Sequence, residues 1–322
     1  MFTQVYHNMR INFHYENHNP VDTHCWSHAM DMLFYSLKLK YPEFELNKVH
    51  WWSGLKENFD WNKDKNYDKF KHSTVSSMMM VIENADNGNY FVVSYWDKGY
   101  YEIVAWHDHK DKCFGVFSSD GMHTEDLNYT PAPIDYTPTS LMMCSMSTEK
   151  VVDEMYFNNL KNNNRVIPEK LNFRCLVPYL FRKYLHDNDN RFQIDVNWVN
   201  PVEFLEYMNK FTINMDINGV AEPSCRTAQV LGLGSVLIRP KLKVKTHNEL
   251  IADYHYVEVE CENLGNYKLL ADSYIDKFEK IKNDKEYLNF ISKNARKYYE
   301  ENCTVESHVR IMTDLIDLNK LK

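Results

Sequence analysis

The sequence has no run of 18 consecutive apolar residues, and its first twenty residues lack a basic segment followed by an apolar one. The first absence argues against a membrane-spanning helix and the second against a secretory signal peptide. There is also no internal repeat and no low-complexity tail. We therefore expect a chain that is folded from end to end and works in the cytoplasm.

Regularly spaced metal ligands and paired cysteines are also lacking. The seven cysteines include no Cys-x-x-Cys pair, which is typical of thiols in a reducing compartment. His107, Asp108 and His109 are adjacent, so their side chains point in different directions. Asp187 and Asp189 lie in an Asn-rich loop, which favours a solvated turn. We predict no metal ion and no cofactor.

Positive charge is scarce overall, with a net charge of -8 and a pI of about 6.0. No general basic field attracts the chain to nucleic acid, so any polyanion must meet a local cluster of cations. The 322 residues, 44% of them hydrophobic, exceed the usual size of a single core. Two lobes are therefore expected.

Strand-like and helix-like apolar patterns alternate along the chain. In the first half, "YFVVSYW" and "CFGVFSS" are strand-like and "WSHAMDMLFYSLK" is helical. In the second half, "TINMDI" and "GSVLIRP" are strand-like, and "PVEFLEYMNKF" is helical. We predict an α/β fold with lobes at 1–165 and 166–322, in which such alternation builds parallel sheets.

The stretch "NGVAEPSCRTAQVLGLGSVLIRP" follows one of these strands and contains an unusually placed arginine. Ser224 is a candidate N-cap, which puts Arg226 in the first helical turn, beside the positive end of the helix dipole. A partner with more than one negative charge reverses that unfavourable interaction, and a diphosphate fits. The alternative is a surface arginine that pairs with a neighbouring carboxylate.

The order of motifs here resembles the C-terminal half of GT-B glycosyltransferases. It comprises a Gly-containing loop, Ser-x-Arg, a small-residue helix, "GSVLI", "HY" followed by "VEVE", and "ISKNARKYYEEN". The arrangement, over about 168–318, is similar to Cap10-like and protein O-glucosyltransferases and to viral, chlorovirus-type sugar transferases. This resemblance implies two Rossmann-like lobes with a donor cleft between them and C-terminal helices that close the sheet.

The resemblance also implies a nucleotide-sugar donor held by the second lobe. Gln229 stands where many relatives have an acidic residue that binds ribose, and Cys175 replaces a usual glycine. Arg182 facing solvent and His255 as a packed histidine are the alternatives at those positions. The implied donor-binding residues are Arg174, Arg182, Asn218, Gly219, Glu222, Ser224, Arg226, Thr227, Gln229 and His255.

Loops of the first lobe are expected to supply the catalytic base and the acceptor site. Asp22 or His24 is our first choice for the base and Asp97 the second, because each follows a strand and lies near aromatic residues. Asp120 in an Asp-Gly turn ranks third, and Asp22 as a simple helix cap is the alternative. Trp26 and Trp96 offer surfaces on which an acceptor sugar can stack.

The sequence thus predicts a metal-independent transferase that moves a sugar from a nucleotide diphosphate, UDP first and GDP second, to a hydroxyl of a glycan or glycoprotein. Inversion is favoured, because Val230 stands eight positions after Glu222, where retaining relatives place a second glutamate. One rival is a lectin-like sugar or nucleotide-sugar binder on the same fold. Another is a hydrolase with Cys25 as its nucleophile.

Overall fold

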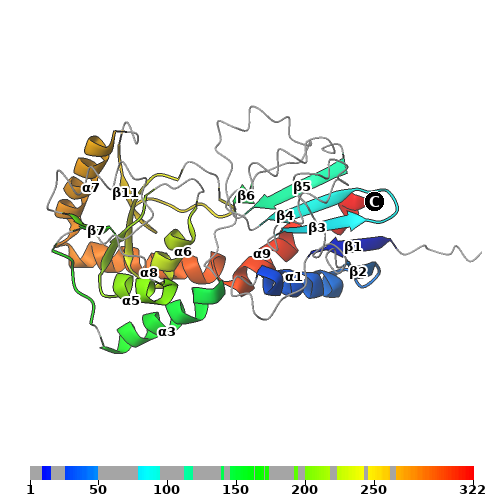
Figure 1. Cartoon of the computed structure of the whole chain (residues 1–322), viewed down its shortest axis with the longest axis horizontal. Coiled ribbons are helices and arrows are strands. Elements are labelled where there is room, and N and C mark those ends of the chain that lie inside the picture. Colours follow the sequence, from blue (N-terminus) through cyan, green and yellow to red (C-terminus); the bar gives the residue numbers. More distant parts are fainter. Residues whose placement is uncertain are drawn as a thin grey trace, which may run out of the picture. The chain divides into compact units, whose positions relative to one another are not determined.

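The structure is a computed structural model of the chain, which divides into two compact units (Figure 1). Unit 1 comprises Met1–Leu141 and Val305–Lys322, and unit 2 comprises Met142–Thr304. The residues that the structure describes are 9–15, 26–49, 79–94, 112–118, 139–140, 146–162, 164–169, 171–173, 192–194, 200–217, 223–242, 246–261 and 266–322.

Unit 1 contains a mixed six-stranded sheet. Strand β3 runs antiparallel to both of its neighbours, whereas the β1–β2, β4–β5 and β5–β6 pairs are parallel. A Rossmann-like lobe has parallel central strands, so β3 is a departure from that pattern. The strand order is β2 (Glu45–Val49), β1 (Arg10–His14), β3 (Met79–Asn84), β4 (Tyr90–Ser94), β5 (Cys113–Ser118) and β6 (Thr139–Ser140).

Two helices, α1 (Trp26–Lys40) and α9 (Val305–Leu315), pack together in unit 1. Helix α1 buries residues at three- and four-residue spacing, which is why its apolar pattern predicted a helix. At the end of α1, Lys40 and Tyr41 donate hydrogen bonds to the carbonyl of Ile316, which directly follows α9, and Lys40 also donates to that of Thr313 in its last turn. Residues 305–322 therefore belong to the core of unit 1.

The described strands of unit 2 form two parallel sheets. The alternation of strand-like and helix-like segments in the sequence predicted parallel pairing. The larger has the order β11 (Val257–Val259), β10 (Val236–Pro240), β9 (Ile213–Met215), and the smaller pairs β7 (Leu171–Phe173) with β8 (Phe192–Ile194).

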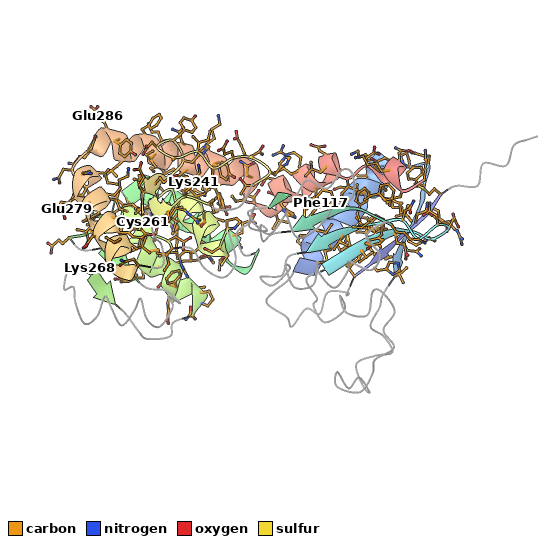
Figure 2. The ribbon with its side chains drawn as sticks, turned by 90° about the horizontal axis from the view of Figure 1, so that it is seen from above. Phe117, Lys241, Cys261, Lys268, Glu279 and Glu286 are labelled. Atoms are coloured by element: carbon orange, nitrogen blue, oxygen red, sulfur yellow. The ribbon has the colours of Figure 1, made fainter. Side chains whose placement is uncertain are left out.

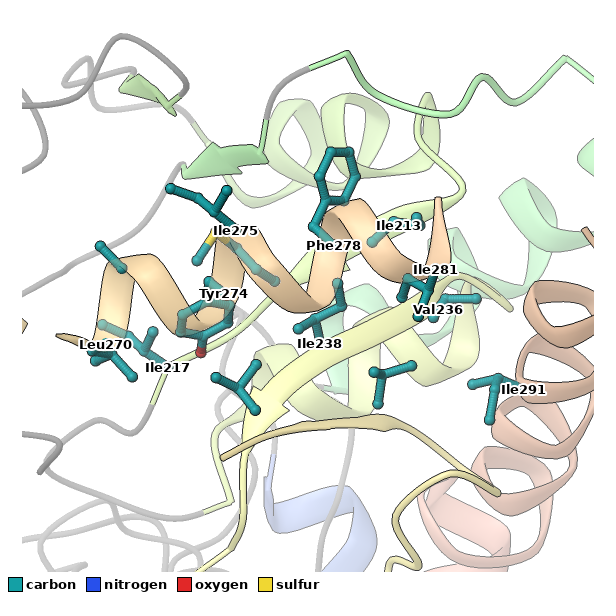
Figure 3. Packing of buried hydrophobic residues seen from close by; sticks show 14 of the residues in the cluster. Ile213, Ile217, Val236, Ile238, Leu270, Tyr274, Ile275, Phe278, Ile281 and Ile291 are labelled. Carbon is teal, nitrogen blue, oxygen red and sulfur yellow. The ribbon is translucent and has the colours of Figure 1, made fainter. Parts of the chain in front are cut away.

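Helices cover both faces of the three-stranded sheet. Figure 3 shows Tyr274 and Phe278 of α7 (Tyr267–Ile281) against Ile213 and Ile238, which alternate along their strands with residues that face the other way. Exposed side chains such as Lys268 mark the outer face of α7 (Figure 2). The opposite face packs against α3 (Met146–Asn162), α5 (Pro201–Asn209), α6 (Cys225–Gly232) and the later part of α8 (Lys285–Asn302).

The predicted α/β class is confirmed by this arrangement. The lobe boundaries 1–165 and 166–322 stay a prediction beside the two compact units. Helix α3 lies in unit 2, and α9 lies in unit 1, where it packs on α1. The assignment of one lobe to the acceptor and the other to the donor stays a prediction.

Candidate functional site

The end of β9 and the start of α6, called here the β9–α6 turn, carry Ser224 and Arg226, which the sequence analysis placed at a donor phosphate. Ser224 adopts an extended backbone (φ -72°, ψ 153°), and its side chain accepts a hydrogen bond from the Thr227 N–H. This confirms Ser224 as the N-cap of α6. The helix begins at Cys225, so Arg226 lies in its first turn as predicted.

Asp216, the residue that follows β9, is the centre of this turn. Its carboxylate is only 1% exposed and receives four polar partners. Oδ2 accepts hydrogen bonds from the Ser224 hydroxyl at 3.0 Å and the Thr227 hydroxyl at 2.6 Å. Oδ1 accepts one from Arg226 Nη1 at 3.2 Å. The first turn of α6 is therefore tied to the end of β9 by one buried carboxylate.

A second arginine, Arg239 near the end of β10, reaches the same carboxylate. Its Nη1 lies 3.8 Å from Asp216 Oδ2 and donates to the Thr227 hydroxyl at 2.7 Å. Strand register explains the meeting, because Met215 pairs with Ile238 and the next residues along the two strands are Asp216 and Arg239. Arg239 is only 1% exposed, whereas the Arg226 side chain is 20% exposed.

The backbone of Asp216 is held as firmly as its side chain. Its N–H donates to the Ile238 carbonyl on β10, and its carbonyl accepts a hydrogen bond from the Tyr274 hydroxyl on α7. A neighbouring strand and helix α7 thus fix the position of this residue. If α6 moves, the Asp216 carboxylate can follow it only by breaking these two backbone hydrogen bonds.

Electrostatics at this turn favour an anion. Two guanidinium groups, those of Arg226 and Arg239, face the carboxylate of Asp216. The N-terminal amides of α6 lie beside these two cations and add the positive end of the helix dipole. The alternative reading of Arg226, an arginine paired with a neighbouring carboxylate, is also met, because Asp216 is that neighbour.

Helix α6 is held at its other end by two further arginines. Arg296 Nη1 donates to the Gly232 carbonyl at 2.6 Å, and Arg165 donates to the carbonyls of Leu233 and Gly234. These bonds satisfy backbone acceptors that a helix C-terminus leaves open. Burial lowers the pKa of Arg165 to about 10, so its guanidinium stays charged at neutral pH.

Gln229, predicted to contact ribose, is buried in unit 2. Its Nε2 donates to the Thr148 hydroxyl on α3 at 3.0 Å, so the side chain links two helices. The ribose contact stays a prediction, and in this geometry the amide nitrogen is already engaged.

His255 is a packed histidine here, in accordance with the alternative given for it. Its Nδ1 accepts a hydrogen bond from the Ile251 N–H, and its ring lies against Tyr254 and Tyr298. Burial lowers the pKa of His255 to about 4, so the ring is neutral at physiological pH. Its donor-binding role stays a prediction.

Other predicted site residues cannot be placed. Trp26 begins α1, but its side chain lies outside the described part of the chain. Also outside it are Asp22, His24, Asp97, Asp120, Trp96, Arg174, Arg182, Asn218, Gly219 and Glu222, together with Cys25, His107, Asp108, His109, Asp187 and Asp189.

Sequence reasoning missed Asp216 and Arg239. Each is a charged residue in or directly after a short apolar strand, and both strands lead to one edge of a sheet. Because the carboxyl ends of parallel strands meet at one edge, two such residues of opposite sign were a usable signal for a buried pair.

The described residues show neither a metal-binding group nor a membrane-spanning helix. Across that part of the chain, three or more His, Cys, Asp or Glu side chains do not gather in a group able to hold a metal ion. Of the helices that can be described, none is long and apolar enough to cross a membrane.

Comparison with known proteins gives structural matches only. No family model matches the sequence, and no curated protein matches it. A glycosyltransferase from Rickettsia africae ESF-5 matches 96% of this chain and 98% of its own, at 9% identity and a TM-score of 0.46. TarM matches 67% of this chain at 13% identity and a TM-score of 0.41. The GtfA/B complex matches 88% at 10% identity and a TM-score of 0.35.

This chain spans about half of two of these matched chains, 46% of the TarM chain and 54% of the GtfA/B chain. All three TM-scores lie below 0.5.

Proposed function

We propose that this protein is a GT-B glycosyltransferase of the Cap10-like type that works in the cytoplasm. It transfers a sugar from a nucleoside diphosphate, UDP first, to a hydroxyl of a glycan or glycoprotein, with inversion and without a metal. In this proposal unit 2 binds the donor, and unit 1 supplies the acceptor site and the base.

The observation that carries the proposal is the presence of two arginines at the start of α6. Arg226 and Arg239 meet at the carboxylate of Asp216 beside the amides of a helix N-terminus, at the carboxyl end of a parallel strand. Ligands of open α/β sheets bind at such ends, and helix N-termini favour phosphate groups. Arg226 is the partly exposed member of the pair and is therefore the one that reaches a ligand.

The proposed chemistry is a displacement at the anomeric carbon of the donor sugar. The acceptor oxygen forms a bond to that carbon, its proton passes to the base, and the bond between the carbon and the phosphate oxygen breaks. The nucleoside diphosphate leaves with that electron pair and gains negative charge. Arg226 and the α6 amides stabilise this charge most strongly in the transition state, where it develops.

The first test is a thermal-shift panel of UDP-, GDP-, CMP- and dTDP-sugars with EDTA present. A binding nucleotide raises the melting temperature, and Arg226→Ala should abolish that rise. Arg10→Ala is the matched control, because Arg10 also pairs with an aspartate, Asp86, but lies in unit 1 with a side chain 55% exposed. Its response to nucleotide should equal that of the wild type.

Turnover then separates the enzyme from a sugar-binding protein. Arg226→Ala should reduce transfer by on the order of 10²-fold or more, the usual effect of losing a group that stabilises developing charge. Near-normal transfer by this variant would contradict the donor site. Nucleotide binding without transfer or hydrolysis would support the lectin-like alternative instead.

A further inference from the structure

We propose that Asp216 and Phe204 are positioning residues that hold the guanidinium of Arg226 ready for the phosphates. This inference rests on the proposed function, since it assigns roles to residues that serve the same site. Neither residue is placed against the ligand, and both act through Arg226.

Asp216 fixes one edge of the guanidinium. Its two oxygens divide their partners, because Oδ2 receives the Ser224 and Thr227 hydroxyls and Oδ1 receives Arg226 Nη1. The carboxylate therefore cannot rotate toward Arg226 or away from it without losing both hydroxyl contacts. This leaves Arg226 with an anchored nitrogen at a defined point of the α6 turn.

Phe204 fixes the face of the same group. The Arg226 Cζ atom lies 5.4 Å from the centroid of the Phe204 ring, within the range of a cation–π contact. The ring comes from α5 and packs against the buried cluster beneath α6, so it is itself held in place. An anchored edge and a covered face together restrict an otherwise flexible side chain.

Arg239 explains why an aspartate can serve here without cancelling the site. A carboxylate paired with Arg226 alone would neutralise the arginine that must bind an anion. With Arg239 Nη1 at 3.8 Å, the negative charge of Asp216 is shared between two guanidinium groups and does not act on Arg226 alone. Preorganisation of this kind lowers the entropy that is lost when a ligand binds.

The opposite role for Asp216 gives the opposite result. If the carboxylate competes with phosphate for Arg226, its removal tightens nucleotide binding. If it positions Arg226, its removal weakens binding. The sign of the change in Kd therefore decides between the two.

The experiment is calorimetric titration with whichever of UDP, GDP, CDP and dTDP stabilises the wild type most. Asp216→Asn and Phe204→Leu should each raise Kd by about 10- to 100-fold, the range for residues that orient a binding group. Phe204→Tyr keeps the ring and should retain the wild-type Kd. Asp153→Asn is the matched control, because it removes the same charge from the Asp153–Arg296 pair at the other end of α6.

The decisive readout is the combination with Arg226→Gln. Because Asp216 and Phe204 act through Arg226, neither substitution should weaken binding further in that background, whereas a general loss of structure would add to it. Tighter or unchanged binding by folded Asp216→Asn, or additive losses, would overturn the proposal. If Asp216→Asn does not fold, because Arg239 loses its counter-charge, the Leu and Tyr variants of Phe204 decide alone. A wild type that binds none of the four nucleotides contradicts the proposed function itself.

Discussion

His308 places an ionisable ring in the interior of unit 1, and at the scale of single residues it should make stability depend on pH. Burial lowers its pKa to about 3, from a usual value near 6.5. Below pH 6.5, His308 binds a proton in the unfolded chain but stays neutral in the folded chain, so the free energy of unfolding falls as pH falls. From pH 7.5 to pH 5 the loss should be about 2 kcal/mol, at 1.36 kcal/mol per pKa unit.

This contribution is measured by difference, because carboxylates also titrate in acid. We expect His308→Gln to lose about 2 kcal/mol less than the wild type between these pH values, by hydrogen exchange of the α9 amides. His28→Gln is the control, since His28 is exposed on α1 of the same unit. An acid sensitivity of His308→Gln equal to that of the wild type would contradict the prediction.

Gly232, the last residue of α6, is required by close packing. A Cβ atom there would lie 2.6 Å from Val152 Cγ1 and 2.7 Å from a ring carbon of Tyr299. Helix propensity alone favours alanine, but overpacking costs about 1 to 3 kcal/mol. We therefore expect Gly232→Ala to lower the free energy of unfolding of unit 2 in urea. A stabilised variant would show that α3 and α8 yield at this point.

At the scale of elements, Arg296 of α8 should stabilise the whole of α6. Its guanidinium is buried, contacts Asp153 and Glu300, and donates to the Gly232 carbonyl. Arg296→Met should cost about 2 kcal/mol, below the 3 to 5 found for fully buried pairs, because both carboxylates keep contact with water.

The matched control lies one residue away on the same helix. Lys297 also pairs with a glutamate, Glu301, but its side chain is 68% exposed. Lys297→Met should change the free energy of unfolding by less than about 0.5 kcal/mol. Equal effects of the two substitutions in urea unfolding would indicate that the contact with Gly232 contributes little.

Elements with a strong local signal could be predicted from the sequence. Helix α5 has Asn200 as its N-cap, Pro201 at its first position and buried Leu205 and Met208 at helical spacing. Helix α7 was missed although Leu270, Tyr274 and Phe278 recur at four-residue spacing, because charged residues separate them. Strand β3 was also missed, since only its partners on both sides make it a strand.

The candidate site also contains residues that local sequence predicts and residues that only the tertiary structure brings together. Ser224 and Arg226 could be found because a cap and a first-turn arginine are features of one short segment. The meeting of Asp216 with Arg239 depends on the register of two strands more than twenty residues apart. A shift of one residue would turn Arg239 to the other face of the sheet, so the two charges at strand ends suggest a pair but the strand register decides whether it forms.

At the scale of the whole molecule, unit 1 depends on a segment far along the chain. The Leu321 carbonyl accepts hydrogen bonds from Asn84, Asn87 and Asn89, which form and flank the turn between β3 and β4. The side chain of Leu321 is fully buried. Leu321→Ala should therefore destabilise unit 1 by about 2 to 5 kcal/mol.

Hydrogen exchange can localise that effect. Amides of β3 and β4 should exchange faster in Leu321→Ala, while those of β10 in unit 2 keep their wild-type rates. Leu39→Ala is the control, since Leu39 lies in the same unit but is 83% exposed. Faster exchange in both units would show that they unfold together.

The division of the chain also sets an order for its folding during synthesis. Unit 2 is continuous from Met142 to Thr304, so all of it leaves the ribosome before α9 does. Unit 1 begins first but lacks α9 and Leu321 until residues 305–322 emerge. Domains generally fold as units while the chain grows, so unit 2 should fold before unit 1 although unit 1 begins earlier in the sequence. Until then the apolar side chains of unit 1 that α9 and Leu321 cover are exposed. During this interval a chaperone that binds apolar surface has its largest target.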